Sequence, residues 1–164
     1  MKCELIDDFG ITDYLGFYDK GYGVVEKGKV YLNLYEVLYL VEKEKLECYL
    51  KNKLLSIDEL LDYGRKKEKN FFIKYLVFKD LREKGYVIKS GLKYGGDFRV
   101  YEKGKFRQDH SKWIVHVLTE KESLKMKDFS SKNRVAHSTR KKVLIAIVDS
   151  ENSISYYQTE WIRM

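Results

Sequence analysis

The sequence predicts an α/β protein of the α+β type, built as two subdomains. Three observations predict this class. Residues 1–31 contain short β-prone segments separated by Gly-rich turns, residues 33–84 follow a helical period, and strand patterns return after Gly85. The chain has 164 residues, enough for one ordinary domain or two small subdomains. We place the boundary near residue 84, which gives an N-terminal mixed α/β subdomain of residues 1–84 and a C-terminal subdomain of residues 85–164.

The N-terminal subdomain begins with strands and a hairpin. Val24-Val25 and Val30-Tyr31 flank a Gly-containing turn, which is the pattern of a β-hairpin. Its helices follow. Asn33 is an expected N-cap, because apolar residues recur after it at helical spacing: Leu34, Val37, Leu38 and Val41.

Two more helices complete this subdomain. Ser56 and Glu59 have the spacing of a capping box, so a helix is expected from Ile57 to about Lys69. The next helix is expected from about Phe71 to Lys84, ending at Gly85. The aromatic and aliphatic residues on these helices are expected to form core rather than a cofactor site.

The C-terminal subdomain is expected to contain a mixed sheet of five strands: Tyr86–Lys89, Phe98–Tyr101, Trp113–Leu118, Val143–Val148 and Ile154–Tyr157. The run Val143–Val148 is continuously aliphatic, which is typical of a strand buried on both faces. A short helix is expected just before it, over residues 131–139. Between helix and strand lie three successive cations, Arg140, Lys141 and Lys142.

Composition excludes several classes of protein. No apolar run is long enough to span a bilayer and no signal peptide is present, so we expect a soluble, cytoplasmic protein. Cys3 and Cys48 lack CxxC spacing, so we expect reduced thiols rather than a disulfide framework or a zinc site. The sequence predicts no metal site and no cofactor.

The net charge of +7 lies in the C-terminal half. Residues 1–82 carry 15 basic and 15 acidic residues, whereas residues 83–164 carry 17 basic and 10 acidic residues. Because phosphate contacts dominate charge-driven binding of nucleic acids, this half is expected to bind a polyanion. A basic protein that is merely soluble is the alternative.

Tyr101, His110 and Lys141 each fall at the end of an expected strand or in the loop next to one. If these ends converge, the three side chains suit RNA cleavage without a metal. A general base removes the 2′-hydroxyl proton, a general acid protonates the 5′-oxygen, and a fixed cation stabilises the phosphorane. Nearby cations such as Arg99 would favour an ionised tyrosine.

A metal-dependent nuclease is an alternative enzyme. Asp97 and Glu102 beside Lys103 could hold Mg²⁺ and the metal could activate the phosphate. However, the spacing departs from the usual Asp…Glu-x-Lys pattern, because the lysine adjoins Glu102. Activity in EDTA distinguishes this alternative from the metal-free mechanism.

Several segments, in this order and spacing, closely resemble the archaeal tRNA-splicing (tRNA-intron) endonuclease family: residues 75–82 (YLVFKDLR), 85–89 (GYVIK), 91–101 (GLKYGGDFRVY), 109–111 (DHS) and 134–149 (RVAHSTRKKVLIAIVD). Residues 32–69 are similar more loosely. The resemblance implies a C-terminal subdomain like that of restriction endonucleases. It also implies a catalytic triad with Tyr101 as the base, His110 as the acid and Lys141 as the stabilising cation.

The resemblance further implies the substrate and products. Family members cut bulge-helix-bulge RNA in precursor tRNA without a metal and leave a 2′,3′-cyclic phosphate and a 5′-hydroxyl. Arg134 aligns with a family arginine that stacks on a bulged base, while a second such arginine has no clear counterpart. Tyr156, Tyr157 or Trp161 could stack instead. Lys89, Lys93 and Lys103 are the expected phosphate contacts.

Family subunits of this length assemble as tetramers, either identical or two catalytic with two structural. The apolar contact would come from Ile154–Tyr157 with Trp161 and Ile162. An acidic loop also joins dimers in the family, and residues 119–129 would supply it here. That loop also carries lysines, so both a homotetramer and a heterotetramer stay open. A non-catalytic RNA-binding or assembly subunit is a third possibility, although such a subunit has no need of an intact triad.

Two other histidines are expected to be structural. His116 alternates with the apolar residues of strand Trp113–Leu118, so it should pack in the core or face solvent. His137, in the helix before Lys141, is expected to form a structural hydrogen bond.

Overall fold

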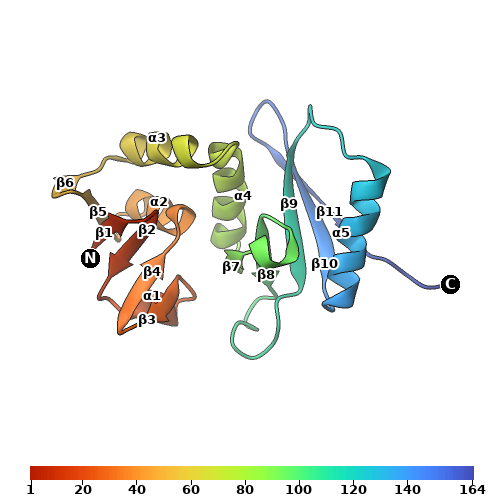
Figure 1. The fold of residues 1–164 in the computed structure, drawn as a ribbon, viewed down its shortest axis with the longest axis horizontal. Coiled ribbons are helices and arrows are strands. Elements are labelled where there is room, and N and C mark those ends of the chain that lie inside the picture. The colour runs from red at the N-terminus through yellow and green to blue at the C-terminus, as the bar shows by residue number, and fades with distance from the viewer. The chain divides into compact units, whose positions relative to one another are not determined.

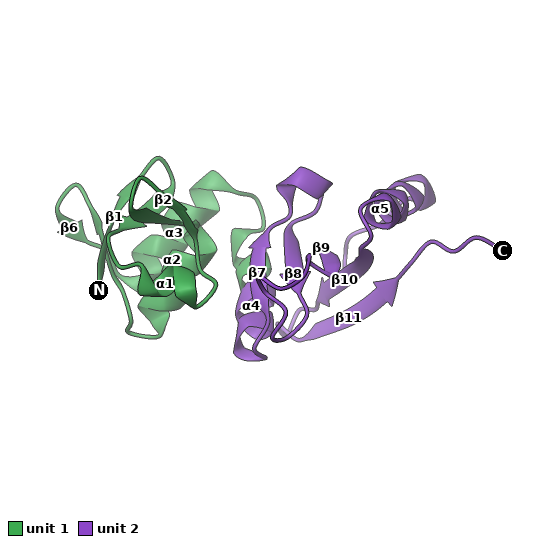
Figure 2. Ribbon diagram, turned by 90° about the horizontal axis from the view of Figure 1, so that it is seen from below, with its two compact units in different colours: residues 1–75 green, residues 76–164 purple.

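The computed structural model describes all residues, 1–164, and divides them into two compact units, residues 1–75 and residues 76–164 (Figure 2). The division falls within helix α4 (Phe71–Glu83), after Tyr75, whereas the boundary expected from the sequence, near residue 84, lies at the C-terminal end of that helix. No helix is both long enough and apolar enough to cross a membrane.

Unit 1 contains a six-stranded sheet in the order β3-β4-β2-β1-β5-β6. Its strands are β1 (Lys2–Ile6), β2 (Phe9–Thr12), β3 (Val24–Glu26), β4 (Lys29–Leu32), β5 (Glu47–Leu50) and β6 (Lys53–Leu54). The expected hairpin is confirmed as the antiparallel pair of β3 and β4. β1 and β5 pair in parallel, and the buried free cysteines Cys3 and Cys48 are direct partners in this pair.

The helices of unit 1 begin where the capping residues predict. Asn33 caps α2 (Leu34–Glu42) and Ser56 caps α3 (Ile57–Lys67), each through a complete capping box. A short helix, α1 (Gly16–Asp19), was not expected from the sequence, because four residues show no helical period. On α2, the side chains of Val37, Leu38 and Leu40 are buried in the core of this unit.

Unit 2 is built on the five-stranded mixed sheet that the sequence predicts, in the order β11-β10-β9-β8-β7. The strands are β7 (Val87–Ser90), β8 (Phe98–Tyr101), β9 (Trp113–Thr119), β10 (Lys142–Val148) and β11 (Ile154–Thr159). β9 and β10 are parallel, and the other neighbouring pairs are antiparallel. The sequence located all five strands to within two residues.

Helices α4 and α5 (Met126–Ser138) flank this sheet on opposite faces (Figure 1). On the α4 face, Phe78 packs against Phe98 with ring centroids 6.0 Å apart, and the Tyr156 hydroxyl donates a hydrogen bond of 2.6 Å to Asp80. This bond ties α4 to the edge strand β11.

On the α5 face, Ala136 forms a buried cluster with Ile114 and Val143. β10 is less enclosed than the sequence predicts, since Val143, Ala146 and Val148 are buried but the residues between them are half-buried. α5 also begins earlier than expected, at Met126 rather than near residue 131. Residues 126–130 carry few apolar residues, so no helical period in the sequence marks this first part of α5.

α5 ends in a Schellman motif that leads directly into β10. The N–H of Arg140 donates to the carbonyl of His137 at 3.1 Å, and the N–H of Lys141 donates to the carbonyl of Ala136 at 2.7 Å. Arg140 has φ of 57°, the left-handed conformation that this motif requires. Lys141 is therefore fixed to the last turn of α5 by its backbone.

Because a side chain disfavours the left-handed region, Arg140→Gly should raise the free energy of unfolding by about 1 kcal/mol. Chemical denaturation measures the change. Ser138→Gly is the matched control, since it places glycine in the last turn of α5 and should destabilise by about 0.5–1 kcal/mol. Equal destabilisation by both substitutions would contradict the motif.

Candidate active site and RNA-binding surface

The topology of unit 2 brings Tyr101, His110 and Lys141 to one edge of the sheet. Tyr101 is the last residue of β8, His110 lies three residues before β9, and Lys141 immediately precedes β10. Because β8 runs antiparallel to β9 and β9 runs parallel to β10, the end of β8 and the starts of β9 and β10 meet at the same edge. The three expected catalytic residues therefore come from adjacent strands.

Lys141 is a buried cation, with 8% of its surface exposed. Its Nζ lies 3.4 Å from the carbonyl of Thr139, at the end of α5, and 4.9 Å from the centre of the Tyr94 ring. No carboxylate lies within 4.0 Å of this ammonium. No carboxylate therefore compensates this charge within the protein.

Tyr101 is half-buried and has an aromatic ring and a cation as neighbours. Its ring meets that of Phe106 edge-on, with centroids 4.9 Å apart. The guanidinium of Arg99, two residues earlier on β8, lies 5.9 Å from the Tyr101 ring centre. The Nε of Arg99 is buried without a hydrogen-bond partner.

His110 is exposed in the loop between β8 and β9. Its backbone N–H donates to the Asp109 carboxylate at 2.7 Å, which shapes the loop at this residue. The next residue, Ser111, is buried, and its hydroxyl has no hydrogen-bond partner. The imidazole is thus accessible to a substrate while the chain beside it is anchored.

The carboxylates of the alternative metal site do not come together. Asp97 precedes β8 and Glu102 follows it, so five residues of extended chain, about 16 Å, separate them. Asp97 accepts a hydrogen bond of 2.7 Å from the N–H of Val117, and Glu102 pairs with Lys112 at 2.9 Å. No group of three or more potential metal ligands occurs anywhere in the chain. Asp97 and Glu102 therefore do not form the metal pair of the alternative mechanism.

Of the other two histidines, His116 is a core residue on β9, with 6% of its surface exposed. Burial lowers the pKa of His116 to about 4; nearby Lys132 acts in the same direction and Asp97 opposes it. His137 lies exposed on α5, and its ring meets that of Trp161 with centroids 4.5 Å apart. The imidazole of His137 was expected to form a structural hydrogen bond, and in the structure it contacts an aromatic ring instead.

The expected RNA-binding residues differ in accessibility. Lys93 and Lys103 are exposed, and the Lys103 ammonium lies 4.9 Å from the Tyr86 ring centre. Lys89 is only 9% exposed, and its ammonium lies 5.4 Å from the centre of the Phe106 ring. Lys89 is therefore less accessible to a phosphate than the sequence suggests.

Arg134 is exposed on α5, three residues before His137 and hence on the same side of the helix. Trp161, which touches His137, is 41% exposed. Arg134 thus lies on the same side of α5 as the histidine that contacts Trp161, and both a guanidinium and an indole can stack on a nucleobase.

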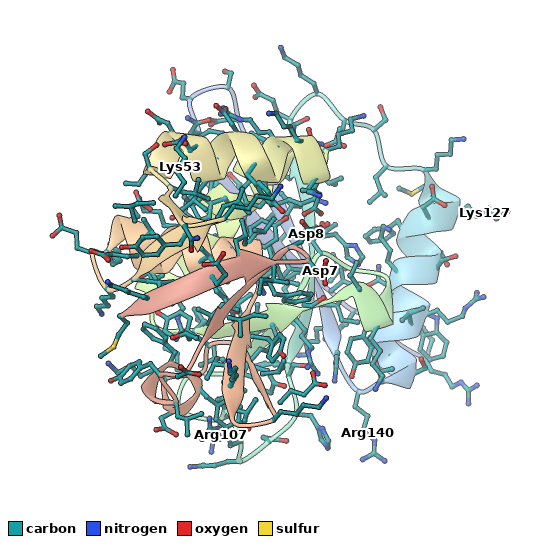
Figure 3. The ribbon with its side chains drawn as sticks, turned by 60° about the vertical axis from the view of Figure 1, so that its left-hand side comes forward. Asp7, Asp8, Lys53, Arg107, Lys127 and Arg140 are labelled. Atoms are coloured by element: carbon teal, nitrogen blue, oxygen red, sulfur yellow. The ribbon has the colours of Figure 1, made fainter.

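The positive charge of the chain belongs to unit 2. Residues 1–75 contain 13 basic and 14 acidic residues, whereas residues 76–164 contain 19 basic and 11 acidic residues. Arg107, in the loop that carries His110, and Arg140, at the junction of α5 and β10, both point outward (Figure 3). These two arginines add positive charge next to Lys141 and in the loop of His110.

Sequence reasoning missed two residues of this site, Tyr94 and Phe106, whose rings contact cations. Tyr94 directly precedes Gly95 and Gly96, where the sequence has no periodic pattern that would give the ring a place in the fold. Phe106 lies in a loop without periodicity, so no sequence pattern marked it.

The fold is a two-unit α/β protein whose second unit carries a tyrosine, a histidine and a lysine at adjacent strand ends, together with most of the excess positive charge. The family model described as "tRNA intron endonuclease, catalytic C-terminal domain" matches residues 71–156, and "tRNA intron endonuclease, N-terminal domain" matches residues 11–61. The chain belongs to the tRNA intron endonuclease family.

Curated relatives agree. The chain is 44% identical over 149 residues to the tRNA-splicing endonuclease of Thermococcus gammatolerans, which covers 90% of this chain and 88% of the relative. It is 43% identical to that of Pyrococcus abyssi, over 88% of this chain and 84% of the relative. It is 41% identical to the tRNA-splicing endonuclease of Methanococcus vannielii, over 89% of this chain and 83% of the relative.

The buried His116 should make stability depend on pH. In the unfolded chain it binds a proton near pH 6.5, but in the folded protein only near pH 4. Between these values the unfolded state binds more protons, so His116 should reduce the free energy of unfolding by roughly 3 kcal/mol as pH falls through this window. Above pH 6.5 it should have no effect.

Urea denaturation at pH 7 and pH 4.5 tests this prediction. His116→Leu should lose part of the pH dependence, whereas His110→Leu, which changes an exposed histidine, should keep it. An identical pH dependence in the wild type and His116→Leu would show that His116 is protonated in the fold.

Proposed function

We propose that this chain is an RNA endonuclease that excises introns from precursor tRNA. It cuts at bulge-helix-bulge structures without a metal and leaves a 2′,3′-cyclic phosphate and a 5′-hydroxyl. The observation that carries the proposal is the β8-β9-β10 arrangement, which places Tyr101, His110 and Lys141 at one edge. Membership in the tRNA intron endonuclease family supports the substrate.

Each residue has one role in this reaction. Tyr101, as phenolate, removes the proton of the 2′-hydroxyl, whose oxygen then attacks the neighbouring phosphorus. His110, as imidazolium, protonates the 5′-oxygen as its bond to phosphorus breaks. Lys141 stabilises the negative charge of the pentavalent phosphorane. Because no carboxylate neutralises Lys141, its ammonium offers a full positive charge at that step.

Binding of the RNA uses the same basic unit. Exposed Lys93 and Lys103 contact phosphates, with a smaller contribution from the less accessible Lys89. Arg134 stacks on an unpaired base of the bulge, and Trp161 is the second stacking partner. The contact of Trp161 with His137, which lies one turn after Arg134 on α5, supports this pairing.

The active form is an oligomer, either a homotetramer or a heterotetramer with a structural subunit. β11 is an edge strand, so its backbone can pair with another chain. Tyr157 on β11 and Ile162 just after it are 56% and 64% exposed, and burial of such side chains stabilises an interface. Native mass determination distinguishes the two assemblies.

Cleavage of a bulge-helix-bulge RNA should persist in excess EDTA, and its product should carry a cyclic phosphate. His110→Ala should lower the single-turnover rate by roughly 10²-fold or more, because the leaving oxygen loses its proton donor. The affinity for RNA should stay near that of the wild type. Gln108→Ala, an exposed neighbour in the same loop, is the control and should cleave normally.

A strict requirement of cleavage for Mg²⁺ would contradict the metal-free mechanism. No cleavage by the protein alone, with cleavage after a catalytic partner is added, would instead show a non-catalytic subunit. Normal cleavage by His110→Ala would mean that another group is the acid.

Substitutions of Arg134 test RNA recognition separately from the chemical step. Base stacking is worth about 1–3 kcal/mol, so Arg134→Ala should weaken binding of the bulged RNA by roughly ten- to a hundredfold. Arg134→Lys should recover only part of the lost affinity, because an ammonium lacks the planar overlap of a guanidinium with a base. Lys127→Ala, near the start of α5, is the control cation and should have little effect.

The measurement compares binding of bulged and fully paired RNA by each variant. If Arg134→Lys binds the bulged RNA as tightly as the wild type does, then Arg134 contacts only a phosphate and does not stack on a base.

A further inference from the structure

We propose that Tyr94 is a positioning residue for Lys141, because its ring face fixes the ammonium at the reaction edge without neutralising it. The Lys141 Nζ lies 4.9 Å from the centre of this ring, within the distance of a cation–π interaction. The inference rests on the proposed function, since it assigns to Tyr94 a part in the RNA cleavage that Lys141 assists.

The backbone around Tyr94 is built to place this ring. Tyr94 ends the short 3-10 helix η1 (Leu92–Tyr94), and its N–H donates to the carbonyl of Gly91 at 2.9 Å. A Cβ on Gly91 would lie 2.6 Å from the carbonyl oxygen of Phe98, and a Cβ on Gly96 would lie 2.4 Å from a methyl group of Ile114. Both glycines therefore allow η1 to approach the sheet closely.

The ring itself is fixed by packing on the α5 face. Tyr94 is half-buried against the cluster of Ile114, Ala136 and Val143. Val143 follows Lys141 by two residues, and the parallel register pairs it with Ile114. The ring thus packs on the same two strands whose N-terminal ends form the reaction edge.

A ring and a carboxylate position a lysine with different consequences. Lys112, just before β9, contacts both the Trp113 ring, 4.8 Å from its centre, and the Glu102 carboxylate at 2.9 Å, so an anionic partner offsets part of its charge. Lys141, just before the adjacent strand β10, meets a ring that carries no net charge. A cation–π interaction orients an ammonium through the ring quadrupole and leaves its full charge for a phosphate.

The end of α5 supplies the second contact of the ammonium. One N–H of Lys141 points to the Thr139 carbonyl at 3.4 Å, and the C-terminal end of a helix favours a cation. Because an ammonium has three donors, donors remain for phosphate oxygens. Without the ring, the flexible four-carbon side chain would lose one of its two fixed contacts.

Single-turnover cleavage of a bulge-helix-bulge RNA by the full-length protein tests the role. Tyr94→Phe keeps the ring and should cleave like the wild type. Tyr94→Leu keeps an apolar side chain but removes the ring, and it should lower the rate at saturating RNA by roughly 3- to 30-fold. RNA affinity should change little, because the ring acts on the chemical step.

A double-mutant comparison separates positioning from packing. If Tyr94 acts through Lys141, then Tyr94→Leu should cause no further loss of rate in a Lys141→Ala background. An equal loss in both backgrounds would overturn the proposal, since the leucine would then damage the site in some other way. Loss of activity by Tyr94→Phe would also overturn it, because the hydroxyl rather than the ring would be responsible.

A spectroscopic measurement tests the contact without activity. In protein labelled with ¹³Cε-lysine, the Lys141 signal, identified by its absence in Lys141→Ala, should be shifted upfield by the aromatic ring. The shift should persist in Tyr94→Phe and vanish in Tyr94→Leu. An unshifted wild-type signal would overturn the positioning role. A wild type that shows the shift but cleaves no RNA would overturn only the proposed function.

Discussion

The parallel pairing of β9 with β10 is the constraint on which the site of this protein depends. It is the one parallel pair in the sheet of unit 2, and it places the starts of two strands side by side. A parallel connection needs a crossover, which α5 provides. The crossover helix ends where β10 begins, so the same connection that satisfies the topology also delivers Lys141 to the edge where β8 ends.

Much of this fold could be predicted from the sequence, because its signals are local. Asn33 and Ser56 marked two helix starts, since a capping side chain satisfies the first backbone N–H groups of a helix. The aliphatic run identified the strand β10, although only Val143, Ala146 and Val148 of it are buried. The presence of the triad residues at strand ends was also visible, although their convergence depends on strand order, which no local pattern encodes.

Contacts between distant segments could not be predicted in the same way. Tyr94 meets Lys141 only because η1 folds back over the sheet, and 47 residues separate the two in sequence. The separation of Asp97 from Glu102 follows from the extension of β8, which a list of candidate ligands ignores. β5 and β6 were not predicted, because strands of four and two residues give little alternation.

The Schellman motif at the end of α5 makes the position of Lys141 depend on the last turn of that helix. The N–H of Lys141 makes the 6→1 hydrogen bond of that motif, so the residue belongs to the last turn of the helix as well as to the reaction edge. Helix ends open locally at lower free energy than a whole domain unfolds. On warming, fraying of this turn would release the ammonium while the five strands stay paired, and the temperature limit of the chemistry would lie below the melting temperature of the fold.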